Sequence, residues 1–301
     1  RQGYGDWLAL DGSGGTEGAT PKDLIGSAFY AHSARLMARI AAALGKKMDA
    51  KRYAGLFETI RRVFIHRFVT ADGLLIGQTQ TACALALRFG LLPTQARPGI
   101  VAALARDIAT RGNHLSTGFV GTPHLPFALS ENGRADIAYA LLNQRAWPSW
   151  LYSVTQGATT IWERWDGWTQ DKGFQTPDMN SFNHYAYGAI GAWLYAVVAG
   201  IDVDETQPGF KRIMFRPQPG GGITQVEAAL DGPYGRIESA WRARGPAWRW
   251  RVAVPPNTSA RAQVPASENE TISADGGTLL ERNATHAIYT LEAGAYTFVV
   301  K

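Results

Sequence analysis

Cysteine is almost absent from this chain of 301 residues, because Cys83 is its single representative. A lone cysteine excludes an internal disulfide framework and a thiolate metal cluster. The six histidines show neither an HxxxH nor an HExxH spacing, so we expect no metal and no cofactor. Apolar runs of about 18 residues are also missing, and we therefore expect no membrane-spanning segment.

Lysine is scarce too, with 7 Lys against 23 Arg in a chain of net charge +5. The densest basic group is Arg61, Arg62 and Arg67, which a solvated helix face explains better than a nucleic-acid surface. The GxSxG elbow of serine hydrolases is missing, and glycine-rich segments lack the Lys of a phosphate loop. Acid–base chemistry by carboxylates is the catalytic option that remains.

The first two-thirds of the chain has the apolar spacing of short and medium helices. Thr20 as N-cap and Pro21 at the first helical position mark the start of the first helix, and Gly45 marks its end. Antiparallel helical hairpins with functional loops fit this pattern. The predicted helices cover residues 20–44, 50–68, 78–89, 98–110, 123–130, 134–144 and 181–199.

Near residue 205 the pattern changes to a period of two, between turns rich in Pro, Gly and Asn. We predict strands over 236–242, 248–254, 287–291 and 295–300, which indicate a small antiparallel β-sandwich. The chain should therefore hold a helical domain over residues 1–204 and a β domain over 205–301. Tryptophans 241, 248 and 250 fit sandwich core or interdomain packing better than a ligand platform.

Residues 157–168, GATTIWERWDGW, are the strongest candidate for a site. Trp162 and Trp165 flank Glu163, and a partly apolar wall tunes the pKa of a carboxylate for proton transfer. Aromatic faces beside carboxylates suit carbohydrate, because sugar C–H faces stack on rings while hydroxyls bond to charged groups. The alternative is a core segment in which Glu163 pairs with Arg164. The residues alone leave both interpretations open.

Three further clusters combine polar and aromatic residues. Ser181 or Asn183 could cap the helix after FNHY, at 182–185, and so place His184 at its mouth. GTPH at 121–124 also lies at a predicted helix start, and YGDW at 4–7 sets Asp beside Trp. Taken alone, the first two clusters are explained slightly better by a capped helix with a satisfied histidine than by a binding site.

Taken together and in order, six motifs resemble the bacterial α-L-rhamnosidases of glycoside hydrolase family 78. They are YGDW at 4–7, GTPH at 121–124, SENG at 130–133, PSWLY at 148–152, GATTIWERW at 157–165 and SFNHYAYG at 181–188. The resemblance covers nearly the whole chain. It implies an (α/α)6 barrel followed by a C-terminal antiparallel β-sandwich, and hydrolysis of terminal α-L-rhamnose with inversion.

The resemblance also implies roles for individual residues. Glu163 matches the general base, His184 matches a histidine that binds the sugar, and Asp6 with Trp7 matches the segment that lines the rhamnose subsite. Further candidates for the pocket wall are our own additions: Trp162, Trp165, Asp166 and His124.

The sequence departs from the family pattern at the general acid, which lies there in a stretch rich in Asp, Glu and Trp upstream of the GDW motif. No such stretch is present, and we count about eight helical segments where six hairpins require twelve. We therefore expect the C-terminal part of a longer enzyme, which acts with the N-terminal part of the same protein, turns over rhamnosides poorly alone and exposes apolar helix faces. If the chain alone were active, Glu131, Asp166 or Asp178 would be the acid candidates.

Two other classes of function stay open. Another six-hairpin protein, either a trehalase-like hydrolase or a polysaccharide lyase that uses Tyr185 and His184, would share the fold. A non-catalytic carbohydrate-binding protein would share the aromatic wall. Rhamnose-containing glycosides or polysaccharides are the expected ligands, and we expect neither a nucleic acid nor a membrane as partner.

Overall fold

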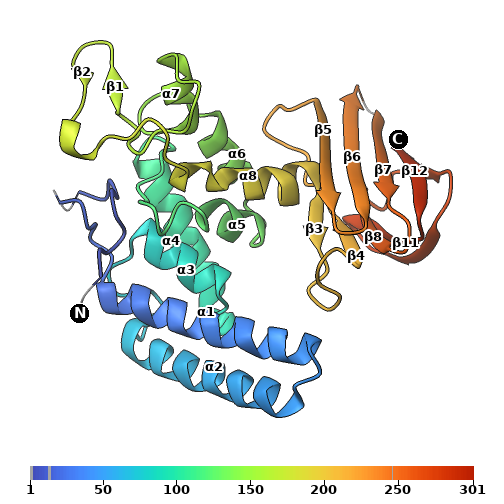
Figure 1. Ribbon diagram of the computed structural model, residues 1–301, viewed down its shortest axis with the longest axis horizontal. Helices are drawn as coiled ribbons and strands as arrows, with labels where there is room; N and C mark the ends of the chain where they lie inside the picture. Colours follow the sequence, from blue (N-terminus) through green and yellow to red (C-terminus); the bar gives the residue numbers. More distant parts are fainter. Residues whose placement is uncertain (1–2, 13–14, 246) are drawn as a thin grey trace. The chain divides into compact units, whose positions relative to one another are not determined.

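The computed structural model describes residues 3–12, 15–245 and 247–301, which form two compact units. The first unit, Arg1–Ile190, is helical, and the second, Gly191–Lys301, is built mainly from β-strands (Figure 1). The units divide earlier in the chain than the expected boundary at residue 204. No helix in these described ranges is long and apolar enough to cross a membrane.

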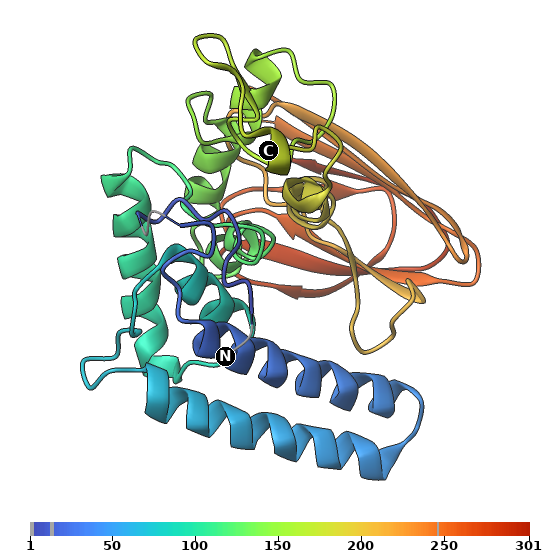
Figure 2. The ribbon, with the colours of Figure 1, turned by 60° about the vertical axis from the view of Figure 1, so that its left-hand side comes forward.

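An antiparallel hairpin of two long helices opens the first unit, α1 (Lys22–Ala43) and α2 (Lys47–Phe68), which lie side by side in Figures 1 and 2. The inner face of α1 is built from small and apolar residues such as Leu24 and Ala28, which are fully buried. Apolar side chains on its outer face, among them Ile40, are exposed in the chain. The predicted exposure of apolar helix faces is therefore found here.

The predicted N-cap of α1 is wrong. The helix begins after Pro21 without a side-chain cap, because the Thr20 hydroxyl instead shares a hydrogen bond of 2.6 Å with the Thr79 hydroxyl. Thr79 is itself the N-cap of the next helix, where its hydroxyl accepts a hydrogen bond from the Ala82 N–H. The two hydroxyls thus join the starts of two helices.

Five shorter helices complete the first unit up to Thr155. They are α3 (Gln80–Arg88), α4 (Arg97–Thr110), α5 (Leu125–Ser130), α6 (Ala135–Asn143) and α7 (Trp150–Thr155). All were predicted except α7. The α3 helix is buried along nearly its whole length, so it forms the core of the unit.

The helix predicted over 181–199 begins only at residue 186 and is irregular. It consists of a 3-10 turn, η3 (Ala186–Ala189), a single α-helical turn, α8 (Ile190–Trp193), and a π-helical segment, η4 (Leu194–Ala199). A two-stranded hairpin, β1 (Trp168–Thr169) and β2 (Gly173–Phe174), and a 3-10 turn, η2 (Pro177–Met179), precede it.

Two five-stranded sheets form the second unit. The first has the order β10-β11-β8-β4-β3 and the second the order β5-β6-β7-β12-β9. Their strands are β3 (Ile201–Val203), β4 (Arg212–Phe215), β5 (Gln225–Gly232), β6 (Gly235–Arg244), β7 (Ala247–Val254), β8 (Ser259–Pro265), β9 (Ile272–Ala274), β10 (Thr278–Arg282), β11 (His286–Leu291) and β12 (Gly294–Val300). The four predicted strands correspond to β6, β7, β11 and β12. One pairing, β4 with β8, is parallel rather than antiparallel.

Aromatic side chains from both sheets meet in the sandwich core. Trp250 is fully buried and contacts Phe215 of the other sheet edge-to-face, with ring centroids 6.1 Å apart. Phe298 and Tyr289 make a second contact between the sheets at 5.1 Å. Trp241 is also buried. The prediction of a helical domain followed by a β-sandwich is confirmed, and Trp241 and Trp250 belong to the sandwich core.

Candidate functional site

Glu163 lies on a stretch of chain that pairs with a second stretch, and we call the two together the clamp: residues 161–163 and 181–184. The Glu163 N–H donates to the Ser181 carbonyl, and the Ser181 N–H donates to Oε2 of the Glu163 carboxylate, both at 2.8 Å. At the other end the His184 N–H donates to the Ile161 carbonyl at 2.9 Å. The clamp thus brings Glu163 and His184 onto adjoining stretches.

The carboxylate of Glu163 is half-exposed and is not neutralised by its neighbour. Arg164 forms its ion pair with Asp166, with 3.1 Å between Nε and Oδ1. Within the described part of the chain, Oε1 of Glu163 accepts no hydrogen bond. One oxygen is therefore held in place by a backbone donor, while the other has no hydrogen-bond donor among these residues.

The tryptophans beside Glu163 are largely buried, with 8% of Trp162 and 5% of Trp165 exposed. The Trp165 ring stacks on Tyr187, with centroids 3.8 Å apart, and meets Trp150 edge-to-face at 5.4 Å. The Trp150 indole donates to the Tyr187 carbonyl at 2.8 Å. These rings form a rigid backing for the clamp, and their direct contact with a sugar stays a prediction.

Asp166 and Trp165 line a hollow of about 20 Å³, together with Arg164 and Tyr187. This volume is far below the roughly 300 Å³ at which small-molecule sites begin, so a sugar ring does not fit in it. Burial is the main cause that raises the pKa of Tyr187, and the charge of Asp6 adds to it. Tyr187 is therefore a neutral phenol.

His184 connects the clamp to the N-terminal YGDW motif through Phe119. The His184 ring stacks on the Phe119 ring, with centroids 4.9 Å apart, and the Phe119 N–H donates to the Trp7 carbonyl at 2.9 Å. Trp7 itself is half-exposed. Phe119 was not predicted as part of the site, because an isolated phenylalanine in a loop carries no pattern that distinguishes it from a core residue.

The predicted cap of the helix after His184 is wrong. The Ser181 hydroxyl accepts a hydrogen bond from the Asn183 N–H at 3.2 Å, and neither residue caps the helical segment that begins at Ala186. Residues 181–184 pair with the first half of the clamp and are not helical. Nδ1 of the His184 ring accepts a hydrogen bond from the Ala186 N–H at 3.4 Å.

Asp6 is fully buried, and its carboxylate accepts four hydrogen bonds. The donors are the Thr81 hydroxyl and the N–H groups of Gly118 at 2.8 Å, Val120 at 2.8 Å and Gly121 at 3.1 Å. Burial raises the pKa of Asp6, and the four hydrogen bonds oppose this effect. Asp6 therefore stabilises the loop that carries Phe119.

His124 lies at the start of α5 inside an aromatic cluster. The centroid of its ring lies 4.9 Å from that of Phe89 and 5.9 Å from that of Phe29. The His32 ring also stacks on Phe89, with centroids 4.0 Å apart. Burial lowers the pKa of His124 to about 4, and the charges of Arg88 and His32 contribute. His124 is therefore neutral at pH 7. No hydrogen bond or ring contact among the described residues joins it to Glu163 or His184.

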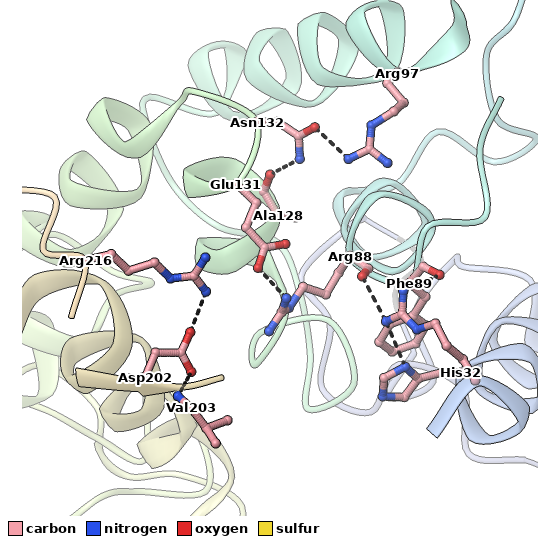
Figure 3. Close-up of polar contacts among 11 residues, drawn as sticks. His32, Arg88, Phe89, Arg97, Ala128, Glu131, Asn132, Asp202, Val203 and Arg216 are labelled. Carbon is pink, nitrogen blue, oxygen red and sulfur yellow. Dashed lines mark hydrogen bonds and ion pairs between the residues drawn. The ribbon is translucent and has the colours of Figure 1, made fainter. Parts of the chain in front are cut away.

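Two of the three acid candidates are held in ion pairs. Glu131 pairs with Arg88 (Figure 3). The Arg88 guanidinium also lies 4.5 Å from the centroid of the Phe127 ring. Asp166 pairs with Arg164, as described above. Asp178 lies exposed on η2. No group of three His, Cys, Asp or Glu side chains in the described ranges is arranged to hold a metal ion.

The chain between the two halves of the clamp forms a separate excursion, residues 164–180, which carries the β1–β2 hairpin. The Asn180 amide closes it by donating to the carbonyls of Gly167 and Gln175, both at 2.7 Å. Phe174 at the end of β2 is largely exposed and meets Phe182 edge-to-face at 5.5 Å. The excursion thus presents an apolar ring on the surface beside the clamp.

Comparison with known proteins places these features in one family. Residues 1–198 match the model of the bacterial alpha-L-rhamnosidase 6 hairpin glycosidase domain, and residues 200–278 match that of the bacterial alpha-L-rhamnosidase C-terminal domain. An α-L-rhamnosidase of Streptomyces avermitilis is 42% identical over 298 residues, which are 99% of this chain and 28% of the relative. One from Formosa agariphila is 40% identical over 90% of this chain and 29% of its own length.

Solved structures agree. The crystal structure of the Streptomyces avermitilis α-L-rhamnosidase complexed with L-rhamnose superposes with a TM-score of 0.92 at 41% identity, over 100% of this chain and 28% of that one. The Aspergillus terreus α-L-rhamnosidase gives a TM-score of 0.87 at 30% identity, over 99% of this chain and 33% of that one. This chain spans less than a third of the two curated relatives and corresponds to the portion that includes their C-terminal domain. With a six-hairpin domain followed by a C-terminal β domain, the chain belongs to the bacterial α-L-rhamnosidase family.

Proposed function

We propose that this chain carries the general base of an inverting α-L-rhamnosidase, and that Glu163 is this base. The observation that carries the proposal is the state of its carboxylate, which is half-exposed, fixed through one oxygen by the Ser181 N–H and not ion-paired with any arginine that the structure describes. Family membership supports rhamnosides as the substrates, and one relative has been crystallised with L-rhamnose.

The chemistry requires a carboxylate on the face of the sugar opposite the leaving group. Glu163 accepts a proton from a water molecule through Oε1, and the water oxygen attacks the anomeric carbon as the bond to the leaving oxygen breaks. A second carboxyl group, separated from the first by roughly 6.5–9.5 Å, donates a proton to that oxygen. Because Glu131 and Asp166 are both ion-paired and Asp178 lies exposed on η2, we place the general acid outside these 301 residues, in the remainder of the same enzyme.

Trp7 and His184 are the proposed contacts to the rhamnose ring. Both are half-exposed, and Phe119 links them through its N–H and its ring. In this arrangement Asp6 acts as a positioning residue, since it holds the loop of Phe119 from beneath.

Hydrolysis of α-L-rhamnosyl fluoride isolates the part of the reaction that this chain is proposed to perform. Fluoride leaves without a proton, so turnover needs the base and the sugar contacts and does not need the general acid. We expect the 301-residue chain to hydrolyse this substrate and to release the β-anomer first, as observed by proton NMR. Glu163→Gln should lower the rate by about 10²- to 10⁴-fold, the usual contribution of a general base.

Asp178→Asn is the matched control, because Asp178 is an exposed carboxylate a few residues from the clamp, and this variant should retain the wild-type rate. Initial release of the α-anomer would contradict the inverting mechanism. An unchanged rate in Glu163→Gln, or no turnover of the fluoride by the wild-type chain, would refute the assignment of the base.

A further inference from the structure

Three arginines gather on one face of the second unit, on β6 and β7. Arg242 and Arg249 are direct partners in the antiparallel register, and Arg251 lies opposite Ala240. Residues two apart on a strand share a face, so the three guanidinium groups surround the small side chain of Ala240. All three arginines are exposed.

The pairing of Arg242 with Arg249 is unfavourable without a ligand. Like charges directly opposite each other in a sheet destabilise it. Arg251 is compensated by Glu238, with 3.5 Å between Nη2 and Oε2. Within the described residues, Arg242 and Arg249 have neither an ion pair nor a hydrogen bond to their side chains. Residues 191–301 contain as many acidic as basic residues, so this positive charge is a local feature of a neutral unit.

The same residues line a hollow of about 340 Å³. Ala240 leaves space at its base, and Gln225 and Glu227 of β5 form its opposite wall, in register with Arg242 and Ala240. The volume is within the range of about 300–1,000 Å³ that small-ligand sites occupy. The hollow therefore combines two uncompensated cations with an amide and a carboxylate.

We propose that this hollow binds a uronic acid residue of an acidic polysaccharide. Guanidinium groups recognise carboxylates through paired, planar hydrogen bonds, which suits Arg242 and Arg249. Gln225 and Glu227 supply the acceptors that sugar hydroxyls need. A nucleic acid fits less well, because single strands are bound by extended basic grooves with stacked aromatic rings. The choice of a polysaccharide rests on the proposed function, and the charge of the bound group rests on the arginines alone.

The test is isothermal titration calorimetry of the 301-residue chain with trigalacturonate. Its fully methyl-esterified form is the matched ligand, since it keeps the sugar rings and removes the charge. We expect trigalacturonate to bind, the ester to bind at least about tenfold more weakly, and Arg242→Gln/Arg249→Gln to weaken binding of the acid by a similar factor. Arg261→Gln, an exposed arginine on β8 of the other sheet, should leave binding within about twofold of wild type.

Equal affinity for the acid and its ester would overturn the proposal, as would unchanged binding in the double variant. Equal binding of a thymidine oligonucleotide of the same charge would also overturn it, by showing an unselective polyanion surface. Glu163→Gln should keep full affinity for trigalacturonate, and the double arginine variant should keep full turnover of rhamnosyl fluoride. Failure of this site and failure of the proposed catalytic site are thus told apart.

Discussion

Replacing Asp6 with alanine removes the acceptor that four donors share. The Thr81 hydroxyl and the N–H groups of Gly118 and Gly121 are buried, and that of Val120 is at the edge of the core. Each buried donor without a partner costs about 1–3 kcal/mol. Since water reaches Val120 and the loop can relax, the four costs do not add fully. We expect Asp6→Ala to lower the free energy of unfolding by about 3–5 kcal/mol.

Asp6→Asn should have an intermediate effect. The amide oxygen can replace either Oδ1 or Oδ2, but the NH₂ group then faces at least one backbone N–H, that of Gly118 or those of Val120 and Gly121. The neutral amide is cheaper to bury than a carboxylate whose pKa burial raises, and this gain offsets part of the loss. We expect a cost of about 2 kcal/mol.

Urea unfolding, followed by tryptophan fluorescence, measures these costs, and hydrogen exchange with mass spectrometry locates them. Exchange of the peptide over residues 116–122 should accelerate by about 100-fold or more in Asp6→Ala, because its N–H groups lose their acceptor. Asp178→Asn should differ from wild type by less than about 0.5 kcal/mol. A cost below about 1 kcal/mol for Asp6→Ala, with unchanged exchange in this peptide, would refute the role assigned to Asp6.

Two further predictions concern the first unit. Burial lowers the pKa of His124 to about 4, so the unfolded state binds a proton at a higher pH than the folded state does. The contribution of this neutral imidazole to the free energy of unfolding is therefore complete above about pH 6.5, and it declines by roughly 2–3 kcal/mol towards pH 4. His124→Phe should flatten this part of the stability profile and the exposed His66→Gln should not, and an unchanged slope in the first variant would argue against a buried neutral imidazole. A Cβ on Gly118 would lie 2.1 Å from the Trp7 carbonyl oxygen, so Gly118→Ala should lower the free energy of unfolding by more than about 3 kcal/mol. Gly55 lies in α2 with open space around its Cβ position, so Gly55→Ala should raise the free energy of unfolding by about 0.5–1 kcal/mol. Thermal denaturation compares the two alanine variants, and equal melting temperatures would count against the tight contact at Gly118.

Local patterns predicted the regular elements of the fold. The helices α1 to α4 and α6 and the strands β6, β7, β11 and β12 show a clear period. The start of the helix after residue 181 could not be predicted in this way. Ala-rich sequence favours a helix there, but residues 181–184 pair with residues 161–163, and hydrogen bonds between distant stretches leave no periodic trace in either one. The parallel pairing of β4 with β8 escaped prediction for the same reason.

The candidate site was predictable in its chemistry and less so in its geometry. The motif around Glu163 and its resemblance to one family predicted this carboxylate as the general base, and that role stays a prediction. The sequence also left open that Glu163 pairs with Arg164. Only the structure decided this point, because Arg164 forms its ion pair with Asp166. The burial of Asp6 was not predictable, because aspartate is normally exposed and the three N–H groups that it binds belong to a loop more than a hundred residues away in the chain.

The clamp has a consequence for how this enzyme family can diversify. Hydrogen bonds at both ends of the clamp, between Glu163 and Ser181 and between Ile161 and His184, separate the length and composition of the excursion from the position of the carboxylate. Insertions, deletions or new side chains around the exposed ring of Phe174 can therefore change the surface beside the clamp while the carboxylate that we propose as the base stays in register.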